Sequence, residues 1–122
     1  MKISYGALLG AAALMFAGSA LAADNVGAYG TVAQVTVNGS SSDDIYAARG
    51  RLVIDEGQQF YRTYQWAGTA CNGKNLSEAE VANLMMALKD RRELTVTPLW
   101  KAGAGSTRCL VAYRITAIEV AQ

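Results

Sequence analysis

Aromatic and arginine side chains interleave along one short stretch of the chain, and a further tryptophan follows near residue 100. Arg62, Tyr64 and Trp66 stand at every second position, and Trp100 ends a later stretch of alternating residues. An aromatic ring can stack on the apolar C–H face of a sugar while a guanidinium group donates hydrogen bonds to the oxygens. We therefore take Trp66, Trp100, Tyr64 and Arg62 as candidate ligand-binding residues.

The same side chains also have a purely structural interpretation. In a small β-rich fold most aromatic rings fill the core, and arginines on strands usually lie on a solvated face. Solvent exposure of Trp66 and Trp100 separates the two hypotheses. Exposed rings would indicate a ligand face, whereas buried rings beside an open apolar strand edge would indicate assembly with a partner.

Catalytic and metal chemistry lack the residues that they need. The chain contains no His, which removes the usual general base, and its two Cys are too few for the usual structural zinc sites. The acidic pairs Asp43-Asp44 and Asp55-Glu56 fall in predicted turns, and adjacent residues of an extended chain point to opposite sides. We expect no enzyme activity, no cofactor and no metal site.

Residues 1–22 have the pattern of a cleaved signal peptide. A positive charge at Lys2 precedes an apolar run over residues 7–17, and Ala20 and Ala22 supply the small side chains that a signal peptidase accepts. The apolar run is shorter than the roughly 20 residues of a bilayer span. We expect export to the periplasm or the medium, with residues 23–122 as one domain without a membrane span.

Removal of this leader leaves ten basic and ten acidic residues. A balanced charge gives no long-range attraction to nucleic acid, whose binding proteins present a basic face, so we expect no nucleic-acid partner. An even pair of cysteines in an oxidising compartment predicts one disulfide, here between Cys71 and Cys109.

Periodicity predicts five strands and one helix. Strands are expected over residues 29–37, 46–54, 60–66, 94–101 and 108–120. Polar residues 38–44 predict a surface loop, and Asp55-Glu56-Gly57-Gln58 predicts a hairpin turn in which Gly57 is free to take a positive φ.

The helix is expected over residues 78–92. Ser77 and Glu80 form a capping box, and Leu76 and Val81 have the spacing of a hydrophobic staple. One apolar stripe, which we expect to pack on a sheet, consists of Val81, Leu84, Met85 and Leu88.

The resulting order is three strands, one helix and two strands. This order predicts a mainly β fold with one helix, a five-stranded OB-like barrel of order β-β-β-α-β-β. A split βαββ arrangement or a curved antiparallel sheet packed by one helix would use the same elements.

The mature chain resembles the receptor-binding B subunits of bacterial A-B toxins. The features that carry this resemblance are the strand order, the helix over residues 78–92 and the cysteine pair Cys71 and Cys109. The resemblance is architectural and transfers no sequence motif. It implies a lectin-like module that forms ring-shaped homo-oligomers through strand and helix contacts and binds host glycans.

Two functions are therefore expected from different classes. The first is an exported, non-catalytic binding module that recognises a glycan or a protein surface. The second is a structural or envelope-interaction protein that assembles through an exposed strand edge, with a partner or with its own copies.

Overall fold

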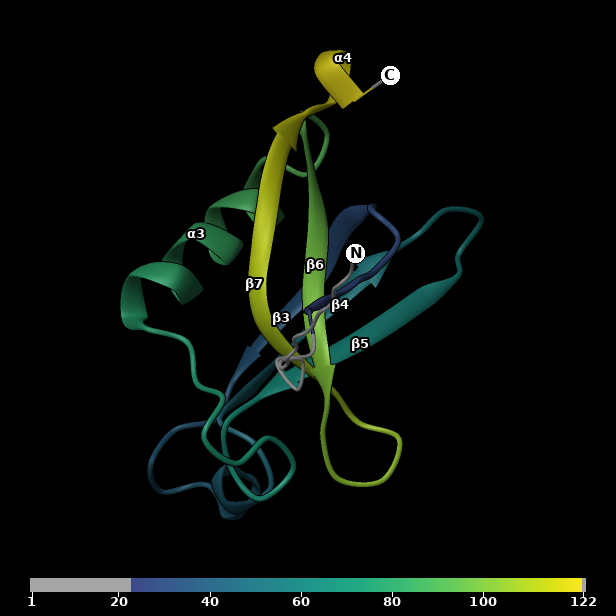
Figure 1. Cartoon of the computed structure of the whole chain (residues 1–122). Helices are drawn as coiled ribbons and strands as arrows, with labels where there is room; N and C mark the ends of the chain where they lie inside the picture. The colour runs from purple at the N-terminus through teal and green to yellow at the C-terminus, as the bar shows by residue number, and fades with distance from the viewer. Residues whose placement is uncertain (1–22, 122) are drawn as a thin grey trace, which may run out of the picture.

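The computed structural model describes residues 23–121, so the predicted signal peptide lies outside the described residues. The main elements follow the expected order (Figure 1). They are β2 (Asn25–Val26), β3 (Thr31–Val37), η1 (Asp43–Tyr46), β4 (Gly50–Asp55), β5 (Tyr61–Trp66), α3 (Glu78–Lys89), β6 (Leu94–Ala102), β7 (Arg108–Ala117) and α4 (Ile118–Ala121).

The strands form one six-stranded sheet of order β2-β6-β7-β5-β4-β3. Every neighbouring pair is antiparallel except β5 and β7, which run parallel where Gln65 lies beside Cys109. The N-terminal segment supplies both edges, because β2 pairs with β6 and β3 pairs with β4. Between them, the backbones of Gly30 and Val96 exchange hydrogen bonds of 3.1 and 2.8 Å.

This arrangement confirms the mainly β fold with one helix packed on a sheet. The sheet is not closed, and the predicted five-stranded barrel is not confirmed. Two strand boundaries were wrong by at least three residues, and the other strand boundaries differ by at most two. Residues 43–46 form a 3-10 turn capped by the Ser42 side chain, so β4 begins at Gly50, and the final strand ends at Ala117 where α4 starts.

Helix α3 begins as the sequence predicts. The Ser77 hydroxyl accepts a hydrogen bond from the Glu80 amide at 3.1 Å, and the Glu80 carboxylate accepts one from the Ser77 amide at 2.7 Å. The helix ends at Lys89, and Asp90 is its C-cap. Leu84 and Ala87 are the helix residues that become fully buried, whereas Met85 of the predicted stripe is exposed.

Packing on the sheet explains why the buried face of α3 differs from the predicted stripe. A face centred on Leu84 and Ala87 lets the helix backbone approach the strands closely, because Ala87 has a small side chain, and it leaves Met85 at the margin. The buried side chains of α3 join a core drawn from all five long strands: Val32, Leu52, Ile54, Tyr64, Trp66, Val96 and Leu110.

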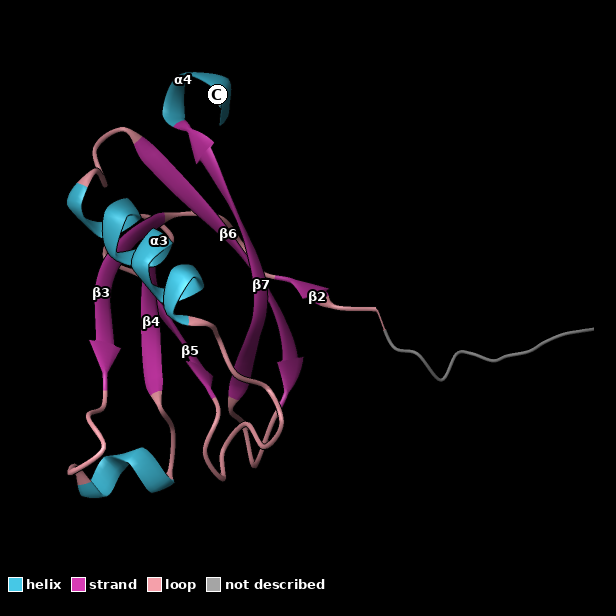
Figure 2. Ribbon diagram, turned by 90° about the vertical axis from the view of Figure 1, so that its left-hand side faces the viewer, coloured by secondary structure: helices cyan, strands magenta, loops and turns pink. Residues whose placement is uncertain are grey.

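The predicted disulfide between Cys71 and Cys109 is present. It ties the loop after β5 to the start of β7, next to a hydrogen bond of 3.0 Å from the Ala104 amide to the Ala70 carbonyl. Figure 2 shows that η1 and the two loops joined in this way lie at the same end of the sheet. An intramolecular disulfide fits an extracellular location. Within residues 23–121, no helix has the length and apolar character needed to span a bilayer.

Candidate functional site

The four candidate residues divide between the core and its margin. Tyr64 and Trp66 are 0% and 2% exposed, whereas Arg62 and Trp100 are half-buried. Alternate residues of β5 point to opposite faces, and Arg62, Tyr64 and Trp66 share the inner one. Tyr64 and Trp66 therefore offer no ring face to solvent in this structure.

Exposed rings lie instead around the hairpin that joins β4 to β5. Phe60 and Tyr61 are 53% and 55% exposed, and Tyr29 is 53% exposed. Asp55 pairs with Thr31 on one side and with Tyr61 on the other, so the backbone that leads into β3 runs beside the hairpin.

The close approach at this point requires a glycine, since a Cβ on Gly30 would collide with the carbonyl oxygen of Asp55. We call the residues gathered here the hairpin cluster: Tyr29, Asp55, Phe60, Tyr61 and Arg62. In the sequence Tyr61 alternates with Arg62 and Tyr64 on the other side of its predicted strand, and it is not among the four predicted ligand-binding residues. The signal that could have found it is a pair of aromatic residues directly after a turn.

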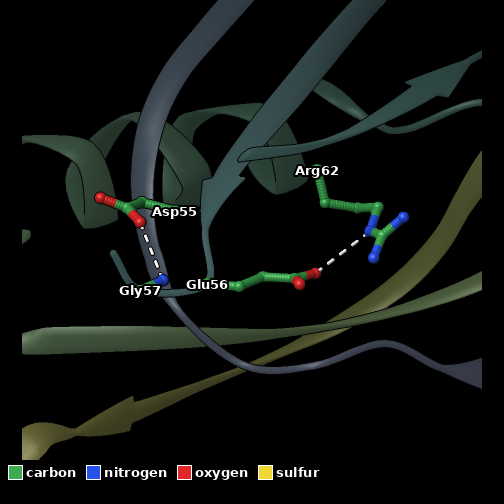
Figure 3. Close-up of polar contacts among 4 residues, drawn as sticks. All are labelled: Asp55, Glu56, Gly57 and Arg62. Atoms are coloured by element: carbon green, nitrogen blue, oxygen red, sulfur yellow. Dashed lines mark hydrogen bonds and ion pairs between the residues drawn. The ribbon is translucent and has the colours of Figure 1, made fainter. Parts of the chain in front are cut away.

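Arg62 is oriented by two contacts (Figure 3). Its Nε donates a hydrogen bond to Glu56 Oε2 at 3.3 Å, and its guanidinium carbon lies 4.9 Å from the centre of the Phe60 ring. Within residues 23–121, the two terminal nitrogens of Arg62 have no hydrogen-bond partner. Arg62 therefore presents a fixed pair of donors beside the ring of the exposed residue Phe60.

Asp55 closes the turn next to this arginine. Its Oδ1 accepts a hydrogen bond of 2.8 Å from the Gly57 amide, and Oδ2 is not engaged in this bond (Figure 3). The hairpin cluster thus has Phe60 and Arg62 on one side of β5, and Tyr61 and Asp55 on the other. Sugars need ring faces for their C–H surfaces, and both donors and acceptors for their hydroxyl groups.

A second arginine, Arg108, lies near Trp100 and Tyr64. The Arg108 guanidinium lies 4.4 Å from the centre of the Trp100 ring. The Tyr64 hydroxyl is buried without a hydrogen-bond partner among the described residues, and a Cβ on Gly27 would collide with it. Burial raises the pKa of Tyr64 above its usual value, and so does the negative charge of Glu56, while Arg108 and Arg62 act in the opposite direction.

A groove of about 720 Å³ lies on a different side, between α3, the end of β3 and the start of β4. Val37, Val81, Ala82 and Met85 give it an apolar lining, and Trp66 contributes to it as well. Arg49 and Glu78 are its charged residues.

Nothing among residues 23–121 resembles a metal centre, since no three His, Cys, Asp or Glu side chains are grouped there. Comparison with models of protein families, with curated proteins and with solved structures finds no match. Among the described residues, the hairpin cluster therefore provides the geometry from which a function can be inferred.

Proposed function

We propose that the protein is an exported, non-catalytic binding module that recognises a saccharide through the hairpin cluster. The observation that carries this proposal is the position of Arg62. Its guanidinium group lies against the ring of Phe60, a residue that is more than half exposed, and its two terminal nitrogens have no hydrogen-bond partner among residues 23–121. Stacking on a ring and hydrogen bonding to a guanidinium group together select a ligand with an apolar face and polar edges.

The strand arrangement supports the same function. The five long strands lie in the order β3-β4-β5-β7-β6, with β5 and β7 parallel, and the segment before β3 also contacts β6. An OB-type barrel has the same strand order, and such scaffolds bind oligosaccharides and oligonucleotides on the face of their second and third strands. Tyr61 lies on the exposed face of β5, the third of the five long strands. The resemblance to toxin B subunits adds a lectin-like role by analogy.

The test is binding to a glycan array by the wild-type protein and by the double variant Phe60→Ala, Tyr61→Ala. Loss of two stacking rings should weaken binding at least about tenfold. Tyr46→Ala is the matched control, because Tyr46 is 74% exposed and lies in η1, next to the other end of β4. Equal losses in both variants, or no binding by the wild type, would contradict the proposal.

The apolar groove beside α3 favours a second candidate function, assembly through this face. The groove lies next to the edge strand β3, and Val37 and Met85 are exposed there. Sedimentation velocity tests this function directly. An oligomer that Met85→Glu converts to monomers would support assembly, and a wild-type monomer at high concentration would exclude self-assembly.

A further inference from the structure

Two arginines from different strands approach the buried hydroxyl of Tyr64. Gln65 of β5 lies beside Cys109 of β7 in a parallel pair, so the preceding residues, Tyr64 and Arg108, are neighbours on the inner face. Arg62 is the next residue on that face along β5. Both guanidinium groups therefore lie near the fully buried hydroxyl of Tyr64, whose pKa both of them lower.

The positive charge of this pair is only partly balanced. Glu56 forms an ion pair with Arg62 through Nε alone, and Arg108 has no ion pair within the described residues. The ring contacts hold both guanidinium planes, over Phe60 and over Trp100 respectively. A cation stacked on a ring still has its N–H groups directed outward in the guanidinium plane, where they can donate hydrogen bonds.

We infer that the saccharide bound here is acidic, and that its carboxylate or sulfate group binds to the outward-directed N–H groups of Arg62 and Arg108. The inference rests on the proposed function and specifies its ligand class. A guanidinium fork matches the spacing of the oxygens in a carboxylate or sulfate, and charge-assisted hydrogen bonds are stronger than neutral ones. A neutral sugar would leave the excess positive charge of the two arginines unbalanced.

The anion site can be tested without any sugar. Inorganic sulfate is titrated into the purified protein at constant ionic strength, and the tryptophan fluorescence is followed, since Arg108 lies over Trp100. We expect a saturable change whose affinity falls at least about tenfold in Arg62→Gln and in Arg108→Gln. Arg114→Gln is the control, because Arg114 is an exposed residue of the same strand. The same response in all four proteins would overturn the anion site.

Matched glycan pairs then identify the source of the anion. Oligogalacturonate is compared with its methyl ester, and chondroitin sulfate with its desulfated form. We expect the charged member of one pair to bind at least about tenfold more tightly, with the preference lost in Arg108→Gln. Equal binding of charged and neutral members overturns the inference and leaves the proposed function standing. Saturable sulfate binding with no binding to any glycan overturns the proposed function and leaves the anion site.

Discussion

The buried hydroxyl of Tyr64 provides a test at the scale of a single residue. A buried polar group without a partner costs about 1–3 kcal/mol, so its removal relieves a cost instead of breaking a bond. Tyr64→Phe should therefore leave the free energy of unfolding at pH 7 unchanged or raise it by about 1 kcal/mol, as measured by urea denaturation.

Tyr113 supplies the control for this substitution. Its hydroxyl donates a hydrogen bond of 2.6 Å to the Glu80 carbonyl oxygen, and Tyr113→Phe should cost about 1 kcal/mol. A larger loss of stability in Tyr64→Phe than in Tyr113→Phe would show that the Tyr64 hydroxyl is satisfied in solution.

Alkaline pH should destabilise the protein through the same tyrosine. Burial raises the pKa of Tyr64 above its ordinary value of 10.0, so the folded chain keeps a proton that the unfolded chain releases. The stability due to this difference is fully present below about pH 10 and is lost as the pH rises toward the pKa of the folded state. The fall in unfolding free energy above pH 10 should be smaller in Tyr64→Phe. An identical pH profile in the two proteins would refute this assignment.

At the scale of an element, the β4–β5 hairpin contains an unusual turn. The backbone φ angles of Gln58 and Gln59 are 55° and 64°, and the Phe60 amide donates a hydrogen bond of 3.0 Å to the Gly57 carbonyl. Two central residues with positive φ define the type I′ turn, which favours Asn-Gly. Each glutamine in this conformation costs about 1–2 kcal/mol.

Replacing the strained pair with the favoured sequence should therefore stabilise the hairpin. The double variant Gln58→Asn, Gln59→Gly is expected to raise the free energy of unfolding by about 1 kcal/mol in urea titrations. Thr63→Gly, in the regular extended backbone of β5, should instead lower it by about 0.5–1 kcal/mol. A loss of stability in the double variant would mean that the glutamine side chains make stabilising contacts in solution.

Elements with a local signature were predictable from the sequence. The capping box of Ser77 and Glu80 fixes the start of α3 through bonds within a few residues, and the alternation of Leu52 and Ile54 marks the buried face of β4. The boundary of β4 was missed because the Ser42 cap competes locally with an extended strand, although Ala48 and Gly50 continue the alternation of buried residues.

The candidate site was harder to predict for a physical reason. Both faces of β5 carry aromatic residues. The two-residue repeat of a strand shows that Tyr61 and Tyr64 lie on different faces, but it does not show which face is buried. The answer depends on long-range packing against α3 and β7. That packing buries Tyr64 and exposes Tyr61, and it brings Arg108 beside Tyr64 from a distant part of the sequence.

At the scale of the whole molecule, the hairpin cluster and the disulfide lie at opposite ends of β5. The hairpin cluster lies where β5 begins, and the loops joined by the disulfide lie beyond the end of β5 (Figures 1 and 2). Because β2 and β3 come from one segment and pair with strands at opposite edges of the sheet, the sheet is strongly curved. Arg62 and Arg108 both come near Tyr64 because β5 and β7 are adjacent, paired strands of this sheet.

The disulfide should stabilise the molecule as a whole, because it links residues separated by 38 positions. By chain entropy alone, a crosslink over such a loop contributes about 4 kcal/mol, mainly by restricting the unfolded chain. The double variant Cys71→Ala, Cys109→Ala should therefore lose about 4 kcal/mol of unfolding free energy. Its unfolding free energy should also fall more steeply with urea concentration, since its unfolded state is more expanded.

The control is the reduced wild-type protein, which keeps both buried sulfur atoms but lacks the bond between them. If it remains as stable as the oxidised form while the alanine variant is destabilised, the loss is due to packing of the side chains and not to the crosslink.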